Sequence, residues 1–306
     1  VYPKLFAGSR YAQRMPIGSD SIIRNFNPDA IRRFYKDWYR PNLMAVVVVG
    51  DITPDAALAL IKKHFSGLVN PVNERKREFV AVPQYSSSEG LVVTDREATS
   101  YVVKINYPVK PETVTRTAGD YRNNMVTRLM ISLLNQRLQE QTQQSNPPFV
   151  AAGSNYGNFI RGYENFSVFA AVGTGDIRRG LEAAMTEIER VKQHGFTAPE
   201  LDRAKKSLIN MMMRLYNNRD KTESELFAEE FLRNFLSHET IPGIEKEYGL
   251  YNEMVPGITL DEINRVAREI MADSNRLVYV TGPESGTVKI PQPADLLAAM
   301  RSTENM

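Results

Sequence analysis

The sequence contains no cysteine. Disulfides, thiolate zinc sites and a cysteine nucleophile are therefore excluded, but the redox compartment stays open, because cytosolic and periplasmic chains can both lack cysteine. A long apolar run is also missing. The longest one, Leu43 to Val49, is far shorter than the roughly 20 residues of a membrane-spanning helix. We therefore expect no membrane span.

Neither sign of charge is in excess. The chain has 38 Lys and Arg against 36 Asp and Glu, a net charge of +2. Because these charges are spread evenly, nothing in the composition favours nucleic acid or an anionic surface as a partner. We expect no nucleic-acid partner.

The chain also lacks an initiator methionine. It begins at Val1 without a basic and then apolar leader, so we expect a processed, truncated or excised polypeptide. With 306 residues, the chain is longer than a domain with a single hydrophobic core usually is. This length indicates two domains, or one whole domain with part of another.

The first clear signal is a helix start at Asn27 and Pro28. Asn27 can cap the free backbone N–H groups, and Pro28 suits the first helical position because its missing N–H would have had no partner there. The stripe on this helix consists of Ile31, Phe34, Tyr35 and Trp38. The unalternating run 43–49 then predicts a strand buried on both faces. A second helix is predicted after Thr53.

A change of composition over residues 70–89, with two prolines, mixed charges and a serine triplet, indicates an interdomain linker. The predicted domain organisation is the end of a first domain at 1–73, a linker at 74–89, a complete second domain at 90–290, and a linker or tail at 291–306. In the second domain we predict strands at 90–95, 100–107, 149–156, 163–172 and 276–281, and helices at 116–143, 176–194, 199–217, 222–237, 243–254 and 260–271. This order predicts an α+β fold, an antiparallel sheet backed by helices.

An internal repeat links the two parts. Shifted by 232 residues, segment 28–50 aligns without a gap on 260–282, with identities that include Ile31 with Ile263, Val48 with Val280 and Gly50 with Gly282. Any amphipathic helix leading into a buried strand would look similar, so chance similarity stays open. If the repeat is a duplication, the first domain is truncated at its N-terminus by roughly 140 residues.

The N-terminal residues also resemble a known family. "SRYAQRMPIGS" followed by "FYKDWYRPNLMAVVVVGDI" is similar to the segment after the active site in pitrilysin/insulinase zinc metallopeptidases, and "LLNQRLQE" and "NPPF" resemble their bacterial tandem members. The resemblance implies duplicated α+β domains, proteolysis of peptides or unfolded proteins, and a zinc cofactor in the parent protein. It also favours the periplasm over the cytoplasm of a Gram-negative bacterium.

The zinc motif that the resemblance implies, His-x-x-Glu-His, is not in this sequence. The histidines are His64, His194 and His238, each isolated and near a predicted helix C-terminus, where the helix dipole favours a cation. We interpret all three as surface residues at helix ends. We expect no catalytic residue, no metal ligand and no bound zinc in this chain, and identify no substrate-binding residue.

One arginine needs separate treatment. The family has a substrate-contacting Arg and Tyr pair in its other half, and Arg137 lies on the analogous helix here. Because "QTQQSNPPF" follows it in place of the expected Gly-Tyr, we interpret Arg137 as a solvated or interdomain arginine.

The resemblance therefore implies one part of a zinc metalloendopeptidase, inactive alone, that walls a chamber for peptide substrates. Its partners would be the remaining halves of the parent chain or a second copy. The alternative is a catalytically silent scaffold or partner subunit of the same fold. The truncation also predicts that residues 1–70 are poorly packed or buried against another copy.

Overall fold

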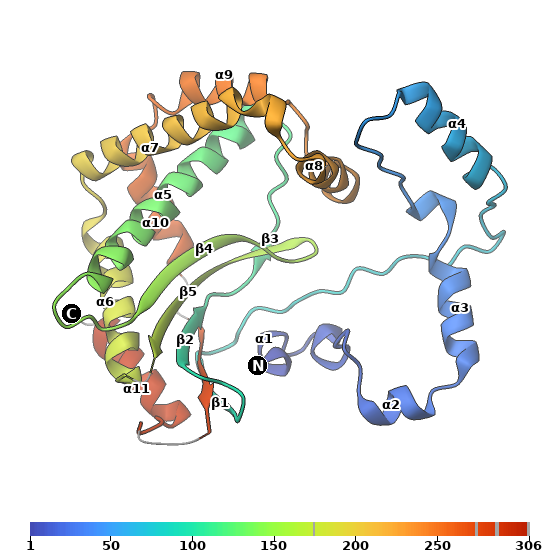
Figure 1. The fold of residues 1–306 in the computed structure, drawn as a ribbon. Helices are drawn as coiled ribbons and strands as arrows, with labels where there is room; N and C mark the ends of the chain where they lie inside the picture. Colours follow the sequence, from blue (N-terminus) through green and yellow to red (C-terminus); the bar gives the residue numbers. More distant parts are fainter. Residues whose placement is uncertain (174, 273–274, 285–287, 305–306) are drawn as a thin grey trace.

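The computed structural model describes residues 1–173, 175–272, 275–284 and 288–304. Its centre is a six-stranded sheet with helices on one face (Figure 1). The strands run in the order β1-β6-β2-β5-β3, and β4 pairs with the other side of β5. They comprise β1 (Glu89–Asp95), β2 (Tyr101–Asn106), β3 (Lys110–Pro111), β4 (Ala151–Ile160), β5 (Tyr163–Gly173) and β6 (Leu277–Pro283). The predicted α+β class is confirmed.

The sheet is mixed, however, because β6 pairs in parallel with β1 and antiparallel with β2. The prediction of an antiparallel sheet is wrong at this edge. The helices and strands between β1 and β6 provide the crossover that a parallel pair needs. The hairpin of β4 and β5 forms the opposite, antiparallel edge.

One face of the sheet packs against helices and forms the main core. The sheet contacts α5 (Ala118–Thr142), α6 (Ile177–His194) and α11 (Pro293–Glu304), and behind these lie α7 (Ala198–Asn217), α9 (Ile244–Met254) and α10 (Leu260–Ile270), with α8 (Ser224–Ser237) beside them. Capping boxes fix the first turns of α5, α7 and α10, where Thr117, Thr197 and Thr259 exchange hydrogen bonds with an acidic residue three positions on. No helix within the described residues is long and apolar enough to cross a bilayer.

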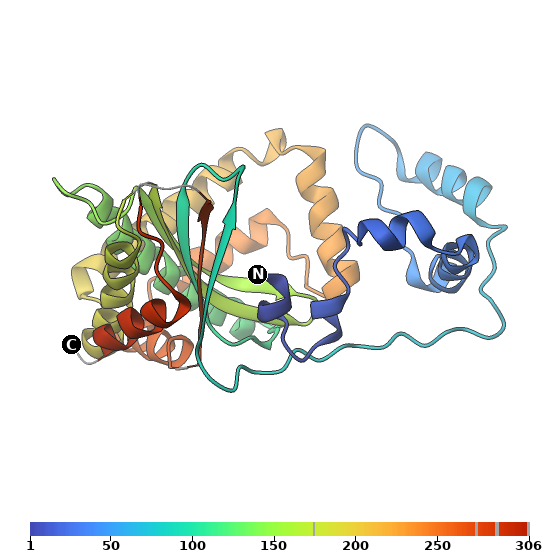
Figure 2. The same cartoon turned by 90° about the horizontal axis from the view of Figure 1, so that it is seen from below.

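The other face of the sheet is covered only in part. Leu5 at the end of α1 (Tyr2–Leu5), Phe6 and Val82 pack there against Leu277 and Tyr279 of β6. Figure 2 shows the N-terminal helix on this side of the sheet, opposite the main helices. The chain start is therefore attached to the second half of the protein, 270 residues away in sequence.

The segment from residue 14 to residue 80 extends away from the sheet (Figure 1). It contains α2 (Asp20–Asn25), α3 (Pro28–Trp38) and α4 (Pro54–Phe65), and none of these helices has a buried residue. In the apolar stripe of α3, Ile31, Phe34 and Tyr35 are exposed and Trp38 is half-buried. The poor packing expected for residues 1–70 is therefore found from residue 14 onward, whereas the expectation is wrong for the chain start, where Leu5 and Phe6 are buried against the sheet.

The predicted buried strand at 43–49 is wrong. Residues 44–49 are irregular, and Met44, Val46, Val47 and Val48 are exposed. A strand needs a neighbour to satisfy its backbone groups, and among the described residues no strand pairs with this run. The two repeats therefore correspond only in part. α3 corresponds to α10, but only the second copy continues into a strand, β6. Residues 273 and 274, in the loop of the second copy, lie outside the described residues.

The predicted tail at 291–306 is also wrong for most of its length. Residues 293–304 form α11, whose Leu296, Ala299 and Met300 are buried. These side chains pack α11 against α6 and β1. Residues 305 and 306 lie outside the described part.

Candidate functional site

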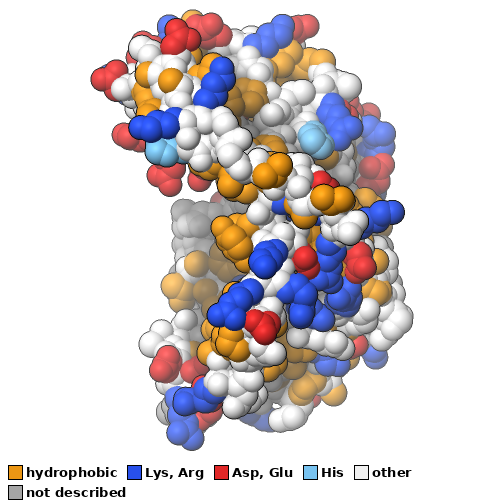
Figure 3. Space-filling view, turned by 90° about the vertical axis from the view of Figure 1, so that its right-hand side faces the viewer, with side chains coloured by type: hydrophobic (Ala, Val, Ile, Leu, Met, Phe, Trp, Pro, Cys, Tyr) orange, Lys and Arg blue, Asp and Glu red, His pale blue; other side chains and the backbone are white. Residues whose placement is uncertain are grey.

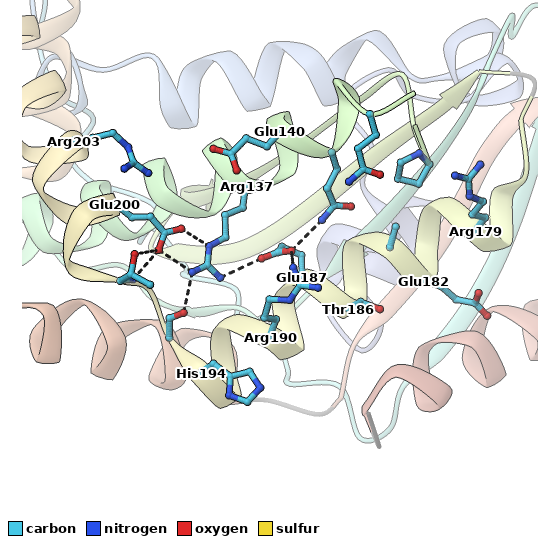
Figure 4. Close-up of a pocket in the computed structure, with 16 residues that line it drawn as sticks. Arg137, Glu140, Arg179, Glu182, Thr186, Glu187, Arg190, His194, Glu200 and Arg203 are labelled. Atoms are coloured by element: carbon cyan, nitrogen blue, oxygen red, sulfur yellow. Dashed lines mark hydrogen bonds and ion pairs between the residues drawn. The ribbon is translucent and has the colours of Figure 1, made fainter. Parts of the chain in front are cut away.

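A cavity of about 1010 Å³ opens between α5, α6 and α7 (Figure 4). Its lining is rich in charge of both signs. The charged side chains include Arg137 and Glu140 from α5, Arg179, Glu182, Glu187 and Arg190 from α6, and Glu200 and Arg203 from α7. We asked whether these groups are free to act on a ligand.

Arg137 is bound on all sides. Its Nε and Nη2 donate to the two carboxylate oxygens of Glu200 at 2.7 and 2.9 Å, and its Nη1 donates to Glu187 at 3.3 Å. Nη2 also donates to the carbonyl of Gly195 at 3.1 Å, and the guanidinium lies 4.8 Å from the ring centroid of Phe196. The interpretation of Arg137 as a solvated or interdomain arginine is therefore wrong, because its guanidinium is bonded within this chain. It joins three helices of one domain, because the two acidic partners lie on α6 and α7.

Glu187 is the most deeply buried group of this cluster, with 2% of its side chain exposed. Besides Arg137, it accepts hydrogen bonds from Gln141 and Arg190, both at 3.0 Å. A buried carboxylate requires such partners, since an unpaired charge in this position would be strongly destabilising.

The ion pair also sets the protonation of Glu200. The hydrogen bonds from Arg137 lower the pKa of Glu200 to about 2, and Thr197 contributes through its hydroxyl and backbone N–H. The same pair raises the pKa of Arg137. A carboxylate this acidic is a poor proton acceptor at neutral pH, so the centre of the cavity is a structural cluster rather than an acid–base site.

The three histidines occupy the ends of helices. His64 lies in the last turn of α4, His194 is the last residue of α6, and His238 caps α8 in a left-handed conformation with φ of 59°. All three are exposed. Their prediction as surface residues at helix ends is confirmed.

The implied zinc does not fit the residues present. Over the described ranges, no group of three or more His, Asp or Glu side chains is placed to hold a metal ion. A catalytic zinc needs about three converging protein ligands. We therefore derive no chemical step through a metal in this chain.

The open half of the sheet is a better candidate for contact with a ligand. Register places Lys104 of β2 beside Phe169 of β5, and Ser167 of β5 beside Asn155 of β4, all on the face opposite the main core. Lys104, Asn155 and Phe169 are exposed, with 41% of Phe169 accessible.

The ring of Phe169 lies close to Gly153 of the neighbouring strand. A Cβ added at Gly153 would come within 2.9 Å of the Phe169 ring, so glycine leaves room for the ring in this position. This surface was not predicted from the sequence. The available signal was the alternation along β5, where Phe166, Val168 and Ala170 belong to the core and Phe169 points to the other face.

Comparisons with known proteins identify relatives of the whole chain. The family model described as "Peptidase M16 inactive domain" matches residues 25–208. The chain is 26% identical to "Zinc protease PQQL-like" of Arabidopsis thaliana, over 92% of this chain and 26% of that protein. It is 25% identical to "Probable zinc protease PqqL" of Escherichia coli, over 99% of this chain and 32% of that protein. The chain therefore spans about a third or less of these relatives.

Solved structures share the fold. The crystal structure of the first half of the periplasmic protease PqqL from Escherichia coli superposes with a TM-score of 0.85 at 22% identity, covering all of this chain and 65% of that one. A predicted insulinase family protease from Yersinia pestis gives a TM-score of 0.81 at 15% identity, with 98% and 64% covered.

Proposed function

Because this chain belongs to the family of peptidase M16 inactive domains, we propose that it is the non-catalytic part of an insulinase-type zinc peptidase and forms a wall of the chamber that receives peptide substrates. The match over residues 25–208 carries this proposal. The relatives named as zinc proteases support zinc as the cofactor of the parent protein.

The open sheet face is the part of the wall that contacts substrate. Lys104, Asn155 and Phe169 offer a positive charge, an amide and an aromatic ring within neighbouring register positions. Such a surface binds a peptide by shape and charge and needs no reacting group. The periplasmic protease whose fold matches this chain supports the periplasm as its location.

Two measurements test whether zinc binding and peptide cleavage belong to the parent protein and not to this chain. After exhaustive dialysis, the 306-residue chain should hold no stoichiometric zinc and cleave no peptide, whereas the parent protein should hold zinc and cleave an unstructured peptide. One tightly bound zinc in the isolated chain would contradict the proposal. A parent protein without zinc or activity would favour the alternative, a catalytically silent scaffold.

The chamber role is tested in the parent protein by Phe169→Ser. We expect KM for a peptide substrate to rise several-fold with kcat nearly unchanged, since only binding is lost. Leu215→Ser, on the exposed side of α7, is the matched control and should change neither constant. Equal KM values for the two variants would remove the substrate role from this face.

A further inference from the structure

We propose that a basic cavity beside Trp38 binds acidic peptide segments, stretches in which carboxylate side chains lie next to apolar ones. The cavity has a volume of about 590 Å³ and lies where the 3₁₀ helix η1 (Arg10–Gln13), α3 and the irregular segment 75–80 meet. This volume is in the range of ligand pockets. The inference rests on the proposed function, because it names a substrate class for the same protein, but binding itself is measured on this chain alone.

The lining of the cavity carries an excess of positive charge. Of its eleven residues one is acidic, Glu78, and five are basic: Arg10, Arg14, Arg75, Lys76 and Arg77. Because the whole chain has a net charge of only +2, the fold has gathered cations here that are spread out in the sequence. Figure 3 views the side of the molecule that carries α3 and α4, and near its middle Lys and Arg side chains gather beside hydrophobic ones.

Only two of these five cations have a carboxylate partner within the described residues. Arg10 donates to Glu78 at 2.9 Å, and Arg75 donates to Asp37 at 3.2 Å. The other three, Arg14, Lys76 and Arg77, make no ion pair in the described part of the chain and are exposed. Such side chains are available to a carboxylate of a ligand, which guanidinium groups bind with strong, charge-assisted hydrogen bonds.

Two of the cations beside the cavity are also crowded together. The guanidinium groups of Arg77 and of Arg161, from the turn between β4 and β5, lie 6.0 and 5.9 Å from the ring centroid of Phe79. Burial and the charge of Arg161 lower the pKa of Arg77. A carboxylate bound here would offset this repulsion between like charges.

The remaining walls select a ligand that also has apolar groups. Three aromatic rings, those of Tyr11, Phe34 and Trp38, line the cavity together with Leu43. The Trp38 ring is further flanked by guanidinium groups, with Arg75 at 5.4 Å and the buried Arg40 at 6.0 Å from its centroid.

The arrangement of the cations favours a peptide over a small anion. Arg75, Lys76 and Arg77 are consecutive residues of an irregular, exposed segment, so their charges follow one another along the chain. A row of cations beside aromatic rings suits several carboxylates and apolar side chains carried by one extended segment, whereas a small anion needs one compact group of donors.

Trp38 is the single tryptophan of the chain, so its fluorescence reports occupation of this cavity. The full 306-residue chain is titrated with a short unstructured peptide of alternating Glu, Leu and Ser, and the matched probe has Gln at each Glu position. We expect the acidic peptide to change the Trp38 signal and to bind at least about 10-fold more tightly than the Gln peptide, because only the former accepts charge-assisted hydrogen bonds. Added NaCl should weaken this binding.

Two matched variants each remove two positive charges. Arg14→Gln with Arg77→Gln changes two lining residues, whereas Lys62→Gln with Lys63→Gln changes two exposed lysines of α4 outside the lining. We expect the first variant to bind the acidic peptide at least about 10-fold more weakly, and the second to stay within about twofold of the natural chain. Equal affinity for the two peptides, an equal effect of the two variants, or complete displacement of the peptide by inorganic phosphate, which would indicate a small-anion site, would each overturn the proposal.

Kinetics of the parent protein test whether the bound segments are substrates. The first variant should raise KM for the acidic peptide and leave KM for the Gln peptide unchanged, and an unchanged KM for both would overturn the assignment of a substrate class. A parent protein that cleaves neither peptide would contradict the proposed function instead, while the titration of this chain would still decide whether the cavity binds acidic segments.

Discussion

The ring of Tyr101 on β2 fills the space that a side chain on Gly282 of β6 would need. The Tyr101 hydroxyl also donates to the carbonyl of Pro283 at 3.1 Å, so the tyrosine is fixed at both its ring and its tip. This contact joins the start of β2 to the end of β6.

Gly282→Ala should therefore destabilise the protein. The added methyl group forces the buried tyrosine ring out of its position, a form of overpacking that costs about 1 to 3 kcal/mol. Gly67→Ala is the control, since a Cβ there meets nothing within 4 Å. Thermal unfolding of both variants checks this; equal midpoints would show that the sheet adjusts to the methyl group freely.

Arg137→Gln should lower the free energy of unfolding more than the loss of a surface ion pair does. The change leaves Glu187, which is buried, and Glu200 without their shared cation, and breaking such a buried pair costs about 3 kcal/mol. Arg178→Gln, which breaks an exposed pair with Glu182 on α6, should leave the urea midpoint unchanged. Equal urea midpoints for the two variants would mean that the ion pairs of Arg137 contribute no more to stability than an exposed pair does.

The same cluster predicts a dependence on pH. The folded pKa of Glu200 is about 2, below its ordinary value of 4.5, so the unfolded chain takes up the proton first. The stabilisation from this group is complete above pH 4.5 and is lost as the pH falls towards about 2. Urea unfolding between pH 6 and pH 2.5 should show a smaller loss for Glu200→Gln than for the natural chain, and parallel curves would contradict this.

Local signals predicted the second half of the fold well. The helix predicted at 116–143 is α5 at 118–142, and the strands predicted at 149–156 and 163–172 are β4 at 151–160 and β5 at 163–173. These elements depend on local signals, such as the capping box that Thr117 forms at the start of α5.

Non-local partners could not be predicted in the same way. The run 43–49 has the composition of a buried strand, but a strand forms only where another one offers its edge. The ion pair of Arg137 with Glu200 joins residues 63 positions apart, and no spacing rule links them. The open sheet face was missed because alternation along β5 shows two faces without showing which one is covered.

The largest correction concerns α11, and it leads to the last prediction. Residues 293–304 were predicted as part of a linker or tail, yet they form a helix that closes the core beside α6 and β1. It also brings Glu304 to Arg276, a buried arginine whose guanidinium lies 5.5 Å from the ring centroid of Tyr107 and 3.8 Å from Glu189. A core that contains a buried cation depends on such a partner.

Leu296→Ala should accordingly behave as a core mutation. Leu296 is 1% exposed, and truncating a buried leucine costs about 2 to 5 kcal/mol through lost burial and the cavity left behind. Leu215→Ala, at a half-exposed position of α7, is the matched control and should cost less than about 0.5 kcal/mol. Chemical unfolding followed by circular dichroism measures both. If Leu296→Ala were as mild as Leu215→Ala, residues 293–304 would be a detachable tail after all, and Arg276 would have to be held by Glu189 and Tyr107 without Glu304.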